Sequence, residues 1–219
     1  MVWVSSLVER ALETRRNEGA RALLREIRRR IWNYQRAIWM VRDLSVTFPA
    51  NTTSAPVEID FSRPEETTAW LLRQHMPGTV DPRELELAEK LRHLLPHVRM
   101  EGEIVGYMKI GFERVYVLDF KKEFDLPPGV AFIYDTYVDP RLRGKNVAPF
   151  LIDRVSGLMK EKGYTEIYCH IRVKNLASIK AYQKCSFKPV RVISWFALLG
   201  LSFFSFPPEK MWMSQSKGR

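Results

Sequence analysis

The chain has 219 residues, of which 46% are hydrophobic and 27% charged, as in ordinary globular domains. This length fits one domain with an extension and excludes a chain too short to bury a sizeable core. The net charge of +10 predicts an anionic partner, for which coenzyme A, nucleic acid and an anionic membrane all qualify.

The cysteine count indicates the compartment. Cys169 and Cys185 make neither a disulfide framework nor a metal-ligand pattern, so we expect a reducing compartment and a cytoplasmic protein. Acidic Glu9 and Glu13 follow a short apolar start, which does not fit a signal peptide. The longest apolar run, residues 195–206, is shorter than the roughly 20 residues that cross a bilayer.

The N-terminal part of the chain is rich in arginine, with ten arginines, four glutamates and no lysine in residues 1–42. Over residues 20–41 apolar side chains recur at steps of three and four, which predicts an amphipathic helix with a basic face. These apolar positions are Leu23, Ile27, Ile31, Tyr34, Ile38 and Val41. We expect the helix to pack on the domain; the alternative is contact with a protein partner or the inner face of the membrane. No reader motif supports nucleic-acid binding.

Residues 1–55 are therefore expected to form a basic helical extension with a linker, and residues 56–219 one α/β domain. Sequence patterns predict strands at residues 57–61, 98–100, 104–110 and 115–120, and helices at residues 62–75 and 81–95. Residues 121–129 are expected to form a loop. The apolar residues 195–206 are expected to close the sheet; a partner surface or a lipid contact is the alternative, and homo-oligomer formation stays open.

The stretch from Asp135 to Ala148, DTYVDPRLRGKNVA, joins a β-rich run to a helix. The run covers residues 130–138, and the helix is expected over residues 148–162. The loop and the first helical turn carry backbone N–H groups without an internal partner, and the helix dipole adds positive charge. Gly144 allows close approach of a ligand, and the arginines add charge-assisted bonds. The arrangement predicts a phosphate-binding loop.

A second informative stretch, NLASIKAYQKCSFKPV, starts at Asn175 and follows a strand expected over residues 166–173. The two stretches together resemble the GCN5-related N-acetyltransferase (GNAT) superfamily, over about residues 57–192. The first is similar to its acetyl-CoA motif Q/R-x-x-G-x-G/A, with Arg141 and Gly144 in place and Asn146 departing from it. The second is similar to N-x-x-(S/A)-x-x-x-Y-x-K-x-G-F, with Ser186 in place of the last glycine. Its matching residues are Asn175, Ser178, Tyr182, Lys184 and Phe187.

The resemblance implies a GNAT fold, a mixed sheet flanked by helices and splayed between two central strands, with the pantetheine arm lying in the gap like an added strand. It implies acetyl-CoA as the acyl donor and no metal; His75, His93 and His97 also lack metal-ligand spacing. The implied donor-binding residues are Thr136, Tyr137, Val138, Arg141, Arg143, Gly144, Lys145, Asn146, Val147, Ala148, Asn175, Ser178 and Lys184.

The resemblance also implies roles in proton transfer. Tyr182 aligns with the tyrosine that protonates the departing thiolate, although a tyrosine packed on a helix face is the alternative. A strand glutamate that serves one branch of the family as base is replaced by Phe132. His170 occupies the base position of another branch, and Asp135 is the second candidate. Histidine can accept a proton near neutral pH, but His170 is equally compatible with a core position.

We therefore predict a CoA-dependent N-acyltransferase that moves an acetyl or other short acyl group to a primary amine in a direct ternary complex. The acceptor, a small molecule or a peptide, is not identified by the sequence. The alternative is a non-catalytic acyl-CoA-binding or scaffold protein with the same fold.

Overall fold

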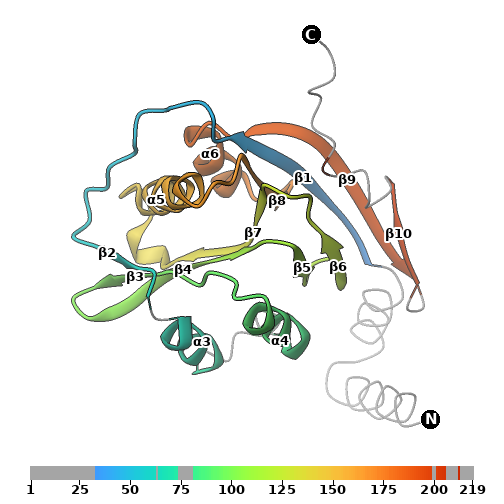
Figure 1. Cartoon of the computed structure of the whole chain (residues 1–219), viewed down its shortest axis with the longest axis horizontal. Helices are drawn as coiled ribbons and strands as arrows, with labels where there is room; N and C mark the ends of the chain where they lie inside the picture. The colour runs from blue at the N-terminus through green and yellow to red at the C-terminus, as the bar shows by residue number, and fades with distance from the viewer. Residues whose placement is uncertain (1–32, 63, 74–80, 199–200, 206–211, 213–219) are drawn as a thin grey trace, which may run out of the picture. The chain divides into compact units, whose positions relative to one another are not determined.

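The computed structural model describes residues 33–62, 64–73, 81–198, 201–205 and 212 (Figure 1). They belong to two compact units: a smaller one, with residues 33–36, 193–198 and 201–205, and a larger one with the other described residues. The helices are α3 (Pro64–Arg73), α4 (Pro82–Lys90), the 3-10 helix η1 (Pro140–Leu142), α5 (Val147–Glu161) and α6 (Leu176–Lys184). The strands are β1 (Asn33–Asp43), β2 (Glu58–Asp60), β3 (His97–Met100), β4 (Glu103–Gly111), β5 (Arg114–Val117), β6 (Lys122–Asp125), β7 (Val130–Val138), β8 (Glu166–Arg172), β9 (Lys188–Leu198) and β10 (Leu201–Phe204).

The main sheet is mixed, with the order β10-β9-β1-β8-β7-β4-β3-β2. Its central strands β7 and β8 are parallel, because α5 carries the chain back between them. The neighbouring pairs β4–β7 and β1–β8 are antiparallel. Strands β5 and β6 form a separate two-stranded sheet. The mixed sheet with flanking helices that the sequence predicts is therefore confirmed.

Helices cover both faces of the central strands, with α5 and α6 on one face and α3 and α4 on the other (Figure 1). The apolar stripe of α5 explains its orientation: Leu151, Ile152, Val155 and Met159 recur at helical spacing and are fully buried. They join buried residues of β4, β7 and β8 in one hydrophobic core.

The opposite face of the sheet carries an aromatic cluster. The ring of Trp39 on β1 lies 5.1 Å from that of Phe132 on β7 and 5.4 Å from that of Trp212. Phe120 and Phe124, from the β5–β6 hairpin, each lie 6.2 Å from Trp39. Such pairs add about 0.5–1.5 kcal/mol each beyond their burial. The cluster therefore fixes the β5–β6 hairpin over the sheet.

The helix predicted over residues 20–41 is wrong from residue 33 onward, and residues 20–32 lie outside the described residues. Strand β1 instead pairs with β8 from Ala37 opposite Arg172 to Asp43 opposite Glu166. Trp39 faces the aromatic cluster and Met40 the core under α5, so both faces of β1 are buried. A strand buried on both faces lacks the two-residue alternation and is easily taken for a helix. Membrane contact through residues 20–41 stays a prediction.

Two other elements differ from the sequence expectation. Helix α4 ends at Lys90 rather than near residue 95, because Arg92 takes a positive φ of 53° and Leu94 bridges to Ile110 of β4. Residues 122–125, expected as loop, form β6. Their pattern is mostly charged, and only Phe124 is buried, so the strand gives little apolar signal.

Apart from the first residues of β1, the described part of the smaller unit is an antiparallel hairpin of β10 and the second half of β9, in agreement with the strands predicted for the apolar C-terminal run. The rings of Phe196 and Phe203 meet across it, tilted by 33° with their centroids 5.8 Å apart, and the Ser205 N–H donates to the Ser194 carbonyl. Among the described helices of both units, none combines the length and apolar character needed to cross a membrane.

Candidate active site

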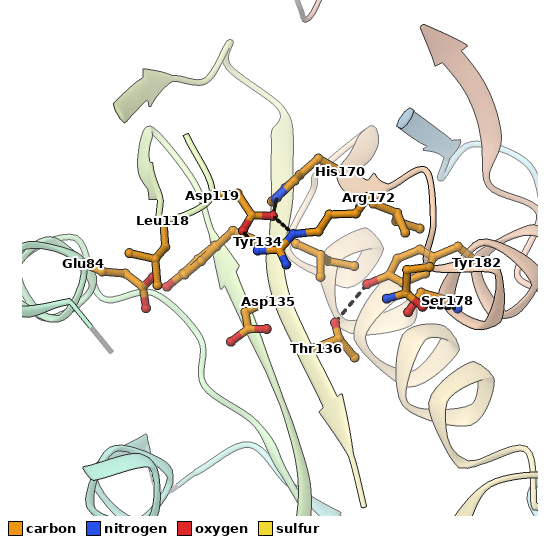
Figure 2. A pocket seen from close by; sticks show the side chains of 13 residues that line it. Glu84, Leu118, Asp119, Tyr134, Asp135, Thr136, His170, Arg172, Ser178 and Tyr182 are labelled. Atoms are coloured by element: carbon orange, nitrogen blue, oxygen red, sulfur yellow. Dashed lines mark hydrogen bonds and ion pairs between the residues drawn. The ribbon is translucent and has the colours of Figure 1, made fainter. Parts of the chain in front are cut away.

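Strands β7 and β8 run together only over their first halves. Their parallel register begins with Val130 opposite Glu166 and ends where Ile133 meets Cys169. Within the described residues no pairing joins residues 134–138 of β7 to residues 170–172 of β8. A cleft of about 280 Å³ opens where the strands separate (Figure 2). One edge of β7 is thus available to an extended ligand that adds like a strand.

The other edge of β7 is occupied by β4. Thr136, Tyr137 and Val138 pair with Met108, Tyr107 and Gly106 in that order. A side chain at Gly106 would bring its Cβ to 2.8 Å from the Tyr137 carbonyl oxygen, so only glycine permits this close pairing. The three residues predicted as a main-chain edge for the donor therefore lie beside the gap, with their opposite side held by β4.

A β-bulge at Tyr134 determines which side chains face each side of the cleft. Lys109 of β4 pairs with Asp135, and the next residue of β4 pairs with Ile133, so Tyr134 is the extra residue. A bulge interrupts the alternation of side chains along a strand. Thr136 consequently joins Ile133 on the α5–α6 face, whereas Asp135 lies on the α3–α4 face. Figure 2 shows Asp135 on the Glu84 side of the cleft and Thr136 on the Tyr182 side.

Tyr182 projects from α6 into the cleft and is almost completely buried. Its hydroxyl lies 2.9 Å from that of Thr136, and its ring meets Phe187 edge-on at 5.0 Å. Burial raises the pKa of the Tyr182 hydroxyl well above its ordinary value. The group therefore keeps its proton at neutral pH and is available as a donor.

The start of α6 explains two further motif residues. The Asn175 side chain caps the helix by accepting a hydrogen bond from the Ser178 N–H at 3.2 Å. Asparagine is among the preferred residues at this position, since its side-chain oxygen satisfies a free helical N–H. Both residues line the cleft on the Tyr182 side. The cap fixes the first turn of the helix that carries Tyr182.

The loop after β7 begins with a turn stabilised by Asp139. This carboxylate accepts hydrogen bonds from the Arg141 N–H at 2.8 Å and from the Arg141 guanidinium at 2.8 and 3.0 Å. The Arg141 side chain is thus engaged outside the β7–β8 cleft. Gly144 has a φ of +78°, and an added Cβ would meet nothing within 4 Å. Its backbone conformation favours glycine, and the space before it is open.

Asn146, which departs from the family motif, has a physical explanation in the backbone. It precedes α5 with a φ of 63°, a left-handed conformation that glycine adopts freely and asparagine tolerates best among other residues. Its side chain donates to the Thr52 carbonyl and accepts from the Lys184 ammonium at 2.8 Å. Asn146 therefore keeps the backbone form of the motif and adds ties to two distant segments.

At the start of α5, four backbone N–H groups donate no hydrogen bond to any described residue. They belong to Gly144, Asn146, Val147 and Ala148. They surround the N-terminus of α5, where the helix dipole is positive. The exposed cationic side chains of Arg143 and Lys145 stand in the same loop. Free N–H donors, a helix N-terminus and adjacent cations suit a diphosphate.

His170 lies deeper in the cleft wall, on β8. Its Nε2 lies 3.3 Å from Oδ2 of Asp119 (Figure 2). The same carboxylate accepts two hydrogen bonds from the Arg172 guanidinium, one from Nε at 3.1 Å and one from Nη2. Burial raises the pKa of Asp119, but the bonds from His170 and Arg172 outweigh it and hold this pKa well below its usual range. An ionised Asp119 makes Nε2 the protonated nitrogen of the ring. Nδ1, the other nitrogen, is buried and has no partner among the described atoms.

Asp135 belongs to a charged network on the opposite wall. Its Oδ2 accepts from the Tyr107 hydroxyl at 2.7 Å and lies 3.6 Å from the Lys109 ammonium. Lys109 contacts the Glu84 carboxylate, and both side chains are buried, at 1% and 4% exposure. Burial raises the pKa of Glu84, while the Lys109 ammonium works in the opposite direction. Asp135 itself remains 34% exposed to the cleft.

The sequence predictions included Asp135, His170 and Tyr182, which the structure brings to one cleft, but missed the residues that hold them. Asp119 reaches His170 from the turn after β5, a contact over 51 positions that no local pattern indicates. Glu84 reads as an ordinary acidic residue in the first turn of α4. Lys109 offered a signal, since it is a lone cation within the apolar stretch of β4.

The model of the acetyltransferase (GNAT) family matches residues 58–187. A Drosophila melanogaster protein of solved structure superposes with a TM-score of 0.57 at 14% identity, over 77% of this chain and 52% of its own. A GCN5-related N-acetyltransferase from Sphaerobacter thermophilus superposes with a TM-score of 0.55 at 16% identity, over 80% of this chain and 55% of its own.

This chain thus spans about half the length of both of these proteins. No curated protein sequence matches it. At such identities the structural likeness supports the fold alone. The family match covers more than half of the 219 residues and includes both central strands, the loop and α6. The chain belongs to the acetyltransferase (GNAT) family.

Proposed function

We propose that this protein transfers an acetyl group, or another short acyl group, from acyl-CoA to a primary amine within a ternary complex. The observation that carries the proposal is the separation of β7 and β8 beyond Ile133 and Cys169. It leaves a main-chain edge that an extended pantetheine arm can follow, with Tyr182 beside it. The donor is the substrate that best fits both this edge and the loop that follows it.

The donor's diphosphate is assigned to the start of α5. The N–H groups of Gly144, Asn146, Val147 and Ala148 supply hydrogen bonds, and Arg143 and Lys145 supply charge. Arg141 contributes through its place in the turn, since its guanidinium is bound to Asp139. Asn175 and Ser178 lie beside the pantetheine path, and Lys184 supports the loop through Asn146.

The reaction needs two proton transfers. An ammonium acceptor must lose one proton before its nitrogen attacks the thioester carbon, and the departing thiolate must gain one. Tyr182 is proposed to protonate the thiolate and to be reprotonated as the attacking nitrogen loses its second proton. The product is an amide and free CoA, with one proton released to the base. General acid catalysis of this kind contributes about 10²–10⁴ in rate.

Two residues compete for the role of base, His170 and Asp135. The Nε2 of His170 is bound to Asp119, and its Nδ1 is buried away from solvent. Asp135 lines the cleft, and its Oδ1 accepts no hydrogen bond from the described residues. We propose Asp135 as the base and His170 as part of the wall that holds Arg172 and Asp119.

The test is an activity assay in which the protein is incubated with acetyl-CoA and each of a panel of small amines and peptides. The assay follows the release of the CoA thiol, and mass spectrometry detects the acetylated product. A reaction without amine measures simple hydrolysis. Acetylated product from at least one amine, formed about a hundredfold more slowly by Tyr182→Phe, supports the proposal. Tight acetyl-CoA binding without product from any amine would instead establish a non-catalytic acyl-CoA-binding protein.

A further inference from the structure

We propose that the acceptor enters the cleft as an ammonium ion bound to Asp135, so that the acceptors of this protein are cationic primary amines without a carboxylate next to the reacting nitrogen. This inference rests on the proposed acyl transfer and names the substrate class of the same site. It follows from the charge, the geometry and the free oxygen of one carboxylate.

The charges around Asp135 do not balance. Lys109 is the cation of this wall, and its ammonium contacts Glu84 as well as lying 3.6 Å from Asp135. Two carboxylates thus share one buried ammonium, which leaves a formal surplus of one negative charge. Asp119 does not change this sum, because it is paired with the guanidinium of Arg172. A second cation in the cleft would complete the pairing that partly buried charges require.

The two oxygens of Asp135 have different surroundings. Oδ2 is taken by the Tyr107 hydroxyl and approached by Lys109. Oδ1 receives no hydrogen bond from the described residues, and the side chain is the exposed member of the network. Tyr107 and Lys109 therefore fix the orientation of the carboxylate and leave one oxygen for a ligand. An ammonium donor is the natural partner of such an oxygen.

The position of Asp135 also suits the reaction. The bulge at Tyr134 places Asp135 and Thr136, neighbours in sequence, on opposite faces of β7. Thr136 contacts Tyr182, the proposed acid for the thiolate. An amine held on Asp135 thus approaches the gap from the α3–α4 face, opposite the acid. One proton passes from the ammonium nitrogen to Oδ1, which breaks an N–H bond and forms an O–H bond, and the neutral nitrogen then attacks.

The same charge disfavours amino acids as acceptors. In an α-amino acid the carboxylate lies two bonds from the ammonium, so it would approach Asp135 and Glu84. Arg172 offsets this repulsion only in part, because its Nε and Nη2 are already bound to Asp119. A simple alkylamine, or the end of a longer polyamine or lysine side chain, carries no such group. On this side the partly exposed rings of Trp70 and Tyr137, 5.9 Å apart, provide an apolar surface.

The experiment measures binding rather than turnover, with CoA present, by ligand-observed NMR titration. The probes are n-pentylammonium, its neutral isostere 1-pentanol, and norleucine, which adds a carboxylate beside the amine. The proteins are the wild type, Asp135→Asn, Glu84→Gln and the control Glu86→Gln, which removes an exposed charge from the same helix as Glu84. Thermal melts verify that each variant is folded, and CoA affinity is measured separately in the same samples.

We expect n-pentylammonium to bind the wild type and Glu86→Gln equally, and Asp135→Asn about tenfold more weakly, as for the loss of a hydrogen bond to a charged group. Glu84→Gln should weaken the binding of n-pentylammonium too, because it removes one of the two carboxylates that share the Lys109 ammonium and so leaves Asp135 more fully neutralised. Three results would overturn the inference. They are equal affinities of the wild type and Asp135→Asn for n-pentylammonium, no binding of n-pentylammonium to the wild type, and an affinity for norleucine equal to that for n-pentylammonium. A protein that binds the amine but not CoA would instead refute the proposed acyl transfer.

Discussion

The hydroxyl of Thr136 on β7 lies 2.9 Å from the hydroxyl of Tyr182 on α6, across the gap where β7 and β8 no longer pair. This contact joins the strand edge assigned to the donor with the helix assigned to the proton donor. It exists because the bulge at Tyr134 turns Thr136 toward α6. The contact fixes the Tyr182 hydroxyl at the point where the thioester sulfur is expected.

Tyr182→Phe should lower kcat by about a hundredfold, the lower end of general acid catalysis. The loss is limited because a thiol with a pKa near 8.5 is already a fair leaving group. Acetyl-CoA affinity should change little, since the ring and its contact with Phe187 are kept. Steady-state kinetics check this, with Tyr168→Phe as the control that removes a hydroxyl far along β8. Equal kcat in the wild type and Tyr182→Phe would remove the acid from the mechanism.

Asp135→Asn should reduce kcat/KM by about a hundredfold for an alkylamine acceptor, because it removes the proposed base. His170→Gln should retain most of the activity and the same pH profile, since its nitrogens face Asp119 and the protein interior. The same acceptor amine must be used with the wild type and both variants, so that the titration of the amine contributes equally to every pH profile that is compared. If His170→Gln abolishes the rise of rate with pH and Asp135→Asn does not, His170 is the base.

Much of the site could be predicted from sequence because its motifs are local. The strand at residues 130–138, the basic loop, α5 and α6 appear near their expected limits, since turn residues and helix caps lie within a few positions of each other. The caps also explain the motif in physical terms. Asn175 bonds Ser178, and both Asn146 and Ser186 take positive φ where the family usually has a small residue.

The parts that could not be predicted depend on distant contacts. β1 reads as a helix because Trp39 and Met40 are buried on opposite faces of a strand that pairs with β8, more than 120 residues away. The bulge at Tyr134 is set by the register with β4, and without it the faces of Asp135 and Thr136 are misassigned. The Glu84–Lys109 pair joins two elements 25 positions apart.

Ser186→Gly should raise the free energy of unfolding by about 1 kcal/mol, the cost of a left-handed backbone for a residue with a Cβ. Ser186 has a φ of 63° just after α6, where its N–H donates to Gln183 and the next N–H donates to Tyr182. Gly163 holds the same position after α5 with the same two bonds. Gly163→Ser should therefore lower the free energy of unfolding by a similar amount. Urea denaturation measures the free energy of unfolding of the wild type and of both variants. A Gly163→Ser variant that is more stable than the wild type would contradict the explanation.

Stability should fall on acidification partly because of His93. Burial lowers the pKa of His93 to about 4, from an ordinary value of 6.5. Below pH 6.5 the unfolded chain binds a proton that the folded chain refuses until about pH 4, so this contribution destabilises the protein increasingly between these values. The loss approaches about 3 kcal/mol. Urea unfolding of the wild type and His93→Gln from pH 7.5 to pH 5 should show a shallower decline in the variant. Parallel declines would refute the assignment.

Binding of acetyl-CoA by the loop before α5 tests the central claim most directly. Saturating acetyl-CoA at about 100 times its dissociation constant should stabilise the wild type by about 2.7 kcal/mol. Gly144→Val should lose most of this thermal shift, because the added side chain enters the open space beside the free N–H groups. Gly163→Val carries the same positive-φ strain outside the loop and should keep the full shift. No thermal shift in the wild type with millimolar acetyl-CoA, or equal shifts in the wild type and Gly144→Val, would contradict the account.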